Sequence, residues 1–202
     1  MIIIQARTTS TRLPGKVLME VMGKPLIWYL VENMKLTGEK IVLATPREDW
    51  KLAEWAVQND VIWFGGDEHD VAARFVACLA AYPCDWFVRV CADSPLLDHR
   101  VVRAVVNRKG YDFVSNVDGG FPSGQHVEMA RTDVFLKHDK HPEHVMPPLY
   151  DLPNKFIVKT IPSDWPGMAV DTAGDFERIS RVIEEAGGQP WKFTWRELQT
   201  YA

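Results

Sequence analysis

The sequence predicts an α/β fold in which a mainly parallel central sheet is flanked by helices. Short apolar runs rich in β-branched residues alternate with segments whose apolar residues recur at helical spacing, from the N-terminus to about residue 115. Strands that alternate with helices of about ten residues or more are typical of right-handed βαβ units. The prediction of an α/β fold depends on this alternation and not on any single segment.

The N-terminal elements show how each assignment is made. Residues 1–6 form a short β-branched run bounded by a polar segment, which predicts a buried strand, and residues 7–24 then read largely as loop. A helix is expected over 25–35, because Pro25 suits a first helical turn and Gly38 suits the exit. The same reasoning predicts strands at 40–44, 61–64, 86–91 and 112–115, and helices at 48–58, 70–81 and 98–108.

The pattern changes after residue 116. Residues 117–127 are rich in Gly, Asp and Pro, and four prolines between 142 and 153 exclude a long helix there. A strand at 156–161 and an amphipathic helix at 175–186 are expected beyond. We therefore predict one domain over 1–202, with a smaller excursion at 119–161 that binds an acceptor or forms a dimer.

Composition excludes several classes of protein. The 202-residue chain has a formal net charge of -4, which gives no overall basic field for nucleic-acid binding. No apolar span is long enough to cross a bilayer, and residues 1–4 are too short for a signal peptide. Three cysteines (Cys78, Cys84 and Cys91) within apolar segments do not suit a secreted disulfide framework. We expect a cytoplasmic protein that binds neither nucleic acid nor membrane.

Residues 5–16 form a hydroxyl-rich, cationic segment directly after the first strand. Ligands of parallel sheets bind outside the carboxyl ends of the strands. Ser10, Arg7, Arg12 and Lys16 offer a hydroxyl and three cations that suit a triphosphate. The segment lacks the spacing of an ATPase P-loop, and composition alone is equally compatible with a solvated basic turn.

The order of residues in this loop resembles the nucleotide-binding loop of the sugar-activating cytidylyltransferases. That group includes the CMP-3-deoxy-manno-octulosonate synthetases, the acylneuraminate cytidylyltransferases and the spore coat polysaccharide biosynthesis cytidylyltransferase-like proteins. The resemblance continues in order to about residue 180, through Gly-Lys-Pro-Leu (23–26), Val-Leu-Ala-Thr-Pro (42–46), the segment 65–74, Val-Arg-Val-Cys-Ala-Asp-Ser-Pro-Leu-Leu (88–97), Asp-Phe-Val-Ser-Asn (112–116), Glu-His-Val (143–145) and Ala-Val-Asp-Thr-Ala-Gly-Asp-Phe (169–176).

This resemblance implies a Rossmann-like nucleotidyltransferase fold, a homodimer, and an enzyme that transfers CMP from CTP to an acidic sugar in polysaccharide precursor biosynthesis. Arg7, Arg12 and Lys16 are then the catalytic residues that hold the phosphates, and Asp93 and Asp171 hold Mg²⁺. Two carboxylates suit this hard cation, which takes its other ligands from water and phosphate. Taken singly, each aspartate is better explained as a turn or cap residue, and only their joint occurrence with the cationic loop favours a metal site.

The resemblance also implies further binding residues. The nucleotide is expected to contact a set of residues after the first, second and third strands: Ala6, Arg7, Ser10, Thr11, Arg12, Gly15, Lys16, Thr45 and Asp70. The small anionic acceptor is expected at Asn116, His126, Glu128 and His144. The chain departs from its relatives at Thr9, Ser123 and His126, where they commonly carry Gly, Asp and Asp, so the nature of the acceptor is open.

The expected reaction is in-line attack of an acceptor oxygen on the α-phosphorus of CTP, with pyrophosphate leaving and no covalent enzyme intermediate. Two alternatives are a glycosyltransferase on the related nucleotide-sugar-binding fold and a catalytically silent nucleotide-binding subunit. Pyrophosphate release from a free triphosphate distinguishes the first, and CTP binding without turnover would indicate the second.

Overall fold

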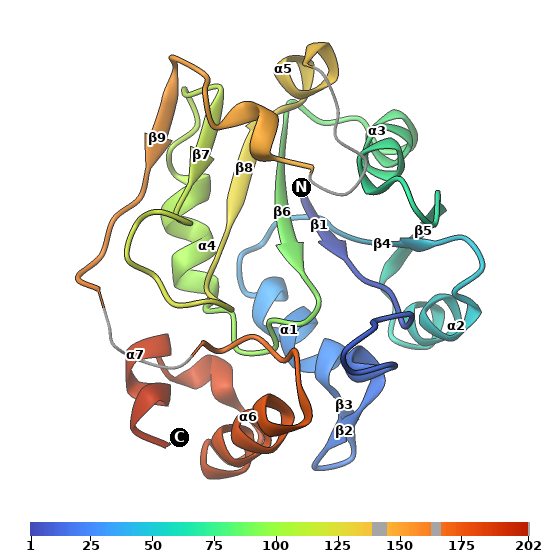
Figure 1. Ribbon diagram of the computed structural model, residues 1–202, viewed down its shortest axis with the longest axis vertical. Coiled ribbons are helices and arrows are strands. Elements are labelled where there is room, and N and C mark those ends of the chain that lie inside the picture. The colour runs from blue at the N-terminus through green and yellow to red at the C-terminus, as the bar shows by residue number, and fades with distance from the viewer. Residues whose placement is uncertain (139–144, 163–166, 202) are drawn as a thin grey trace.

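A seven-stranded sheet, in the order β5-β4-β1-β6-β8-β7-β9, forms the centre of the protein in the computed structural model, which describes residues 1–138, 145–162 and 167–201 (Figure 1). The strands are β1 (Ile2–Gln5), β4 (Ile41–Pro46), β5 (Ile62–Gly66), β6 (Trp86–Cys91), β7 (Phe113–Ser115), β8 (Glu128–Arg131) and β9 (Lys155–Ile157). Only β8 runs antiparallel to its neighbours, so the predicted mainly parallel α/β sheet is confirmed.

Strand β1 is buried on both faces, which explains its continuous apolar sequence. Ile2, Ile3 and Ile4 are all fully buried. Ile2 and Ile4 pack into the larger core on one side of the sheet, whereas Ile3 packs into the second core on the other side. Successive side chains of a strand point to opposite faces, so this one strand supplies both cores.

Helices cover the two faces unequally (Figure 1). The larger core receives buried side chains from α1 (Leu26–Lys35), α2 (Trp50–Gln58), α4 (His99–Val106), α6 (Ala173–Glu185) and α7 (Trp195–Leu198). The second core receives them from α3 (Val71–Ala81) and α5 (Thr132–Lys137). Within the described residues, no helix is long and apolar enough to span a membrane.

Several short elements were not expected from the sequence. These are β8, α5, α7, the hairpin of β2 (Glu20–Val21) with β3 (Lys24–Pro25), and the 3-10 turns η1 (Lys16–Leu18), η2 (Pro147–Leu149), η3 (Pro190–Lys192) and η4 (Gln199–Tyr201). Strand β8 has only four residues and lies between β6 and β7. A four-residue antiparallel strand after a Gly- and Pro-rich loop has too few alternating positions to give a clear periodic signal.

The chain before α6 crosses the edge of the sheet, where its backbone lies close to two other segments. The amide of Met168 donates to the carbonyl of Ser123 at 2.6 Å, and the amide of Val170 donates to the carbonyl of Asp93 at 2.8 Å. Gly124 has a φ of 87°, and a Cβ there would lie 2.4 Å from the carbonyl carbon of Met168. Glycine is required at this crossing, which brings residues 167–171 beside the turn after β6.

Candidate active site

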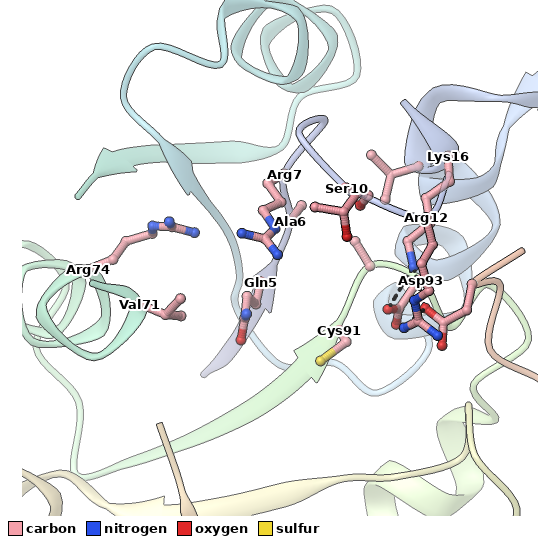
Figure 2. Close-up of a pocket in the computed structure, with 14 residues that line it drawn as sticks. Gln5, Ala6, Arg7, Ser10, Arg12, Lys16, Val71, Arg74, Cys91 and Asp93 are labelled. Carbon is pink, nitrogen blue, oxygen red and sulfur yellow. Dashed lines mark hydrogen bonds and ion pairs between the residues drawn. The ribbon is translucent and has the colours of Figure 1, made fainter. Parts of the chain in front are cut away.

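The first of two adjoining cavities lies beyond the carboxyl ends of β1 and β6 and has a volume of about 180 Å³ (Figure 2). Parallel sheets place their ligand sites at this edge. Most of the expected nucleotide-binding residues line the cavity, namely Ala6, Arg7, Ser10, Thr11, Arg12 and Lys16. Asp93 and Asp171 line it too, although 78 positions separate them in the chain.

Lys16 lies between these two carboxylates. Its Nζ donates to Asp93 Oδ2 at 3.2 Å, to Asp171 Oδ1 at 2.8 Å and to the carbonyl of Val170 at 2.6 Å. Arg12 Nη2 lies 2.9 Å from the same Asp171 oxygen. Only 7% of Lys16 is exposed, so its ammonium is a fixed positive charge inside the site. The cluster therefore holds two cations and two carboxylates at one end of the cavity.

Backbone geometry sets the course of the loop after β1. Gly15 has a left-handed φ of 72°, and its amide donates to the carbonyl of Thr8 at 2.8 Å, which closes the loop on itself. Asp49 accepts from the Thr8 amide at 2.7 Å and from its hydroxyl at 3.0 Å. Gly15 thus shapes the loop without lining the cavity, and Asp49 anchors the loop to the start of α2.

The second cavity has a volume of about 550 Å³ and adjoins the first. Two of the expected acceptor residues, His126 and Glu128, line it. Asp93 and Asp171 line both cavities, so the carboxylates stand at the boundary between them. A group held in one cavity and a group held in the other would meet at these side chains.

A partly buried ion pair forms one wall of the second cavity. Arg89 on β6 faces Glu128 on β8 as a register partner, and its Nη1 donates to Glu128 Oε2 at 2.6 Å. Arg89 Nε also donates to Gln5 Oε1 at 3.0 Å, and the Tyr150 hydroxyl donates to Glu128 Oε1 at 2.7 Å. Burial and the neighbouring Glu128 raise the pKa of Tyr150, so its phenol stays protonated at neutral pH and keeps donating.

Besides Gly15, the structure places three further expected site residues away from the cavities. Thr45 is fully buried, and its hydroxyl donates to the carbonyl of Pro46 and accepts from the Trp63 indole. Asp70 caps α3 by accepting from the amide of Ala73 at 2.7 Å. These two side chains are engaged in structural hydrogen bonds, although the neighbour of Asp70, Val71, lines the first cavity.

Asn116 is also structural, because its fully buried amide donates to the carbonyl of Gln125 at 2.8 Å and accepts from the Val127 amide at 2.7 Å. It shapes the loop that leads to His126 instead of facing an acceptor. The remaining expected acceptor residue, His144, lies outside the described residues.

Several residues that line the cavities had no assigned role, among them Gln5, Arg74, Arg89 and Tyr150. Arg74 and Arg89 stand within matched sequence blocks, and a charged residue within an otherwise apolar strand or helix face is a signal for a buried polar contact. Cys91 also lines both cavities, but burial raises the pKa of its thiol to about 11, which keeps it protonated and un-nucleophilic.

The two carboxylates suit Mg²⁺ better than a transition metal. Among the residues that the structure describes, no group of three or more His, Cys, Asp or Glu side chains could hold a metal ion. Mg²⁺ is commonly held by one or two carboxylates, with water and substrate phosphates completing the shell. Asp93 and Asp171 beside a cationic phosphate-sized cavity fit that description.

Comparison with known proteins bears on the family of the chain. Residues 1–158 match a protein-family model described as cytidylyltransferase. An uncharacterised protein of Methanocaldococcus jannaschii is 30% identical over 194 residues, which cover 87% of this chain and 79% of that protein.

Two solved structures share the fold of this chain. A cytidylyltransferase from Leptospira borgpetersenii serovar Hardjo-bovis superposes with a TM-score of 0.89 and 26% identity, covering 98% of this chain and 90% of that one. A CMP:2-keto-3-deoxy-manno-octonic acid synthetase solved in complex with CTP shares the fold, with a TM-score of 0.74 and 16% identity over 92% of this chain and 98% of that one.

Proposed function

Because the chain belongs to the cytidylyltransferase family, and is thus a CTP-dependent nucleotidyltransferase, we propose that it transfers CMP to a small anionic acceptor such as an acidic sugar. The observation that carries this proposal is the position of Asp93 and Asp171 at the boundary of two cavities. One cavity is cationic and suits a triphosphate, and the other is larger and suits a second substrate. We propose that the product is an activated precursor for the synthesis of a polysaccharide.

In this proposal CTP occupies the first cavity, with its phosphates held by Lys16, Arg12 and Arg7. An acceptor oxygen in the second cavity, which gives its proton to solvent if it is a hydroxyl, attacks the α-phosphorus; the bond to the bridging oxygen breaks, and pyrophosphate leaves with the bonding electrons. Fixed cations stabilise the charge that develops on the phosphate oxygens, which is the main catalytic contribution in reactions of this kind. Cys91 is protonated and no covalent intermediate is required.

Asp93 and Asp171 would hold Mg²⁺, which when bound supplies charge neutralisation at the phosphates. Lys16 lies within hydrogen-bond distance of both carboxylates, so one ammonium and two carboxylates are positioned around one point.

The acceptor would lie against Arg89, His126 and Glu128. Arg89 is held at its Nε by Gln5 and at its Nη1 by Glu128, which leaves Nη2 without a hydrogen-bond partner among the described residues. That nitrogen is a donor for an anionic group of the acceptor, and His126, whose Nε2 faces the carbonyl of Phe121, offers Nδ1 to a hydroxyl group of the acceptor. The segment 119–161, which contributes much of this cavity, is also where we propose that a second copy of the chain docks as a homodimer.

The test is pyrophosphate release from CTP, ATP, GTP and UTP with Mg²⁺ and a panel of sugar acids, with mass spectrometry of the product. We expect release with CTP and an acceptor, and a product heavier than the acceptor by a CMP unit. Asp60→Asn is a matched control, because Asp60 is an exposed carboxylate that lines neither cavity. Turnover of nucleotide sugars without pyrophosphate release would indicate a glycosyltransferase, and CTP binding without turnover would indicate a silent subunit.

A further inference from the structure

Arg74 is a buried arginine that the proposed chemistry leaves without a role. It lies in the first turn of α3 and is 1% exposed, yet it lines the first cavity. Its Nε donates to the carbonyl of Asp67 at 2.8 Å, and its Nη2 donates to the carbonyl of Glu68 at 3.0 Å. A Cβ on Gly66 would lie 2.6 Å from Arg74 Cγ, so a glycine there makes room for the side chain.

These contacts use one edge of the guanidinium and leave Nη1 without a hydrogen-bond partner among the described residues. Figure 2 shows the guanidinium groups of Arg74 and Arg7 pointing toward one another across the cavity. Burial, and then the nearby charge of Arg7, lower the pKa of Arg74, while Asp67, Asp49 and Glu68 act in the opposite direction. An unpaired buried charge is costly, so a partner of opposite charge is expected at this point.

The two ends of the first cavity differ in their charge balance. At one end Lys16 and Arg12 are matched by Asp93 and Asp171. At the other end, within the described part of the chain, neither Arg7 nor Arg74 forms an ion pair with a carboxylate. An anion of high charge, and not a neutral base, is the ligand that best satisfies two facing guanidinium groups, whose planar forks match phosphate oxygens.

We propose that Arg74, together with Arg7, binds the terminal phosphates of the nucleotide and the pyrophosphate formed from them. This inference rests on the proposed function and adds a residue to it. The α-phosphate then lies at the end of the cavity with the two aspartates, and the leaving group lies at the end with the two arginines. Arg74 has a second role as a brace, because it fixes the carbonyls of residues 67 and 68 in the loop before α3.

Isothermal titration of inorganic pyrophosphate, CMP and CTP into wild type and variants tests the proposal. Arg74→Gln should weaken pyrophosphate and CTP binding by roughly 10- to 100-fold, the effect of losing a charge-assisted contact. CMP, which lacks the terminal phosphates, should bind within about threefold of wild type. Arg74→Lys should recover part of the loss, and Arg181→Gln, at an exposed arginine on α6, controls for the change in net charge.

Two results would overturn the inference. Pyrophosphate affinity unchanged in Arg74→Gln would leave only the bracing role, and an equal loss for CMP and CTP would place Arg74 at the base or ribose. If wild type itself bound none of the three ligands, the proposed function would fail together with this inference.

A second measurement covers the case in which Arg74→Gln does not fold. A wild-type crystal soaked with pyrophosphate should show phosphate oxygens within hydrogen-bond distance of both Arg74 and Arg7. Pyrophosphate seated only against Lys16 and Arg12 would overturn the proposal without any variant. Arg7→Gln adds a further check, because Arg7 is exposed and its replacement should weaken pyrophosphate binding without altering the melting temperature.

Discussion

The two cavities share two carboxylates but are built by different means. The first depends on residues 6–16, which directly follow a buried parallel strand, so local sequence determines much of its chemistry. The second depends on long-range pairing, because the antiparallel strand β8 places Glu128 opposite Arg89. A site built from consecutive residues can be predicted from the sequence, whereas a site built by strand pairing can be recognised only once the fold is known. The following experiments test whether this division also separates nucleotide from acceptor binding.

The largest effect should come from the carboxylates that border both cavities. Replacing Asp93 or Asp171 by Asn removes one charge, and we expect turnover to fall by about 10²–10³-fold or more, since electrostatic contacts to the transition state have this magnitude. Folding should survive, because the change keeps size and polarity. Pyrophosphate release measured at a series of Mg²⁺ concentrations checks turnover, and thermal melts check folding.

The opposite pattern, with stability lower by about 0.5–2 kcal/mol and turnover per folded molecule unchanged, would show that these aspartates are only turn or cap residues. Near-normal turnover in both variants would remove the reason for treating the two cavities as one active site. Asp60→Asn again serves as the control.

The next effect concerns the first cavity alone. CTP with Mg²⁺ at about 100 times its dissociation constant should stabilise the protein by roughly 2.7 kcal/mol, by one-site linkage. ATP and GTP at the same concentration should stabilise it less, and thermal shifts measure the ranking. A larger shift with ATP or GTP would contradict the assignment of cytosine to this cavity.

A smaller effect is expected from a change confined to the second cavity. The His126 ring nitrogen lies 3.2 Å from the carbonyl of Phe121, and the side chain lines the second cavity. His126→Asp introduces a negative charge there, so kcat/KM for the acceptor should change by roughly tenfold. CTP affinity should stay within about twofold. His69→Asp, at a side chain that is 91% exposed, is the control. A collapse of CTP affinity with the fold intact would contradict the separation of the cavities.

The smallest effect should leave both cavities in place and act on the helix that follows Asp171. Asp175 completes a capping box with Thr172 at the start of α6. Burial alone would raise the pKa of Asp175, but hydrogen bonds from Thr172 and Arg178 outweigh it and lower the pKa to about 2. Its carboxylate therefore stabilises the fold above its ordinary pKa of 3.8, and this contribution is lost as the pH falls toward 2.

Asp175→Asn should reduce the free energy of unfolding by about 1 kcal/mol at neutral pH. Denaturant unfolding between pH 7 and pH 2 should show the difference from wild type shrinking below about pH 4, as the native carboxylate takes up a proton. A difference that grows on acidification would contradict the lowered pKa.

The sequence was sufficient to predict the alternating strands and helices up to β7. Residues 86–91 form β6 with the predicted bounds, and the other predicted strands and helices up to β7 lie within a few residues of their expected positions. Long apolar runs and helical periodicity gave these assignments. Strand β8 was missed because its four residues are recognisable only from their partners on β6 and β7.

The candidate site was also predicted best where its residues are close together in the sequence. Arg7, Arg12 and Lys16 stand in one loop, and the structure brings them together with Asp93 and Asp171 at the first cavity. Polar residues at other strand ends, such as Thr45 and Asn116, turned out to satisfy buried backbone or side-chain groups. Sequence position alone does not tell whether a polar side chain faces a ligand or a neighbouring segment, because both needs select the same residue types.

The position of Lys16 has a consequence for how the chain folds. Two carboxylates brought together at a sheet edge would repel each other, but the ammonium of Lys16 contacts both and also the carbonyl of Val170. The protein thus carries its own counter-ion at the crossing of residues 167–171. We therefore expect this part of the fold to assemble without a metal, so a chelator should leave the melting temperature of the ligand-free protein unchanged, unlike that of domains whose folding energy comes from a bound ion.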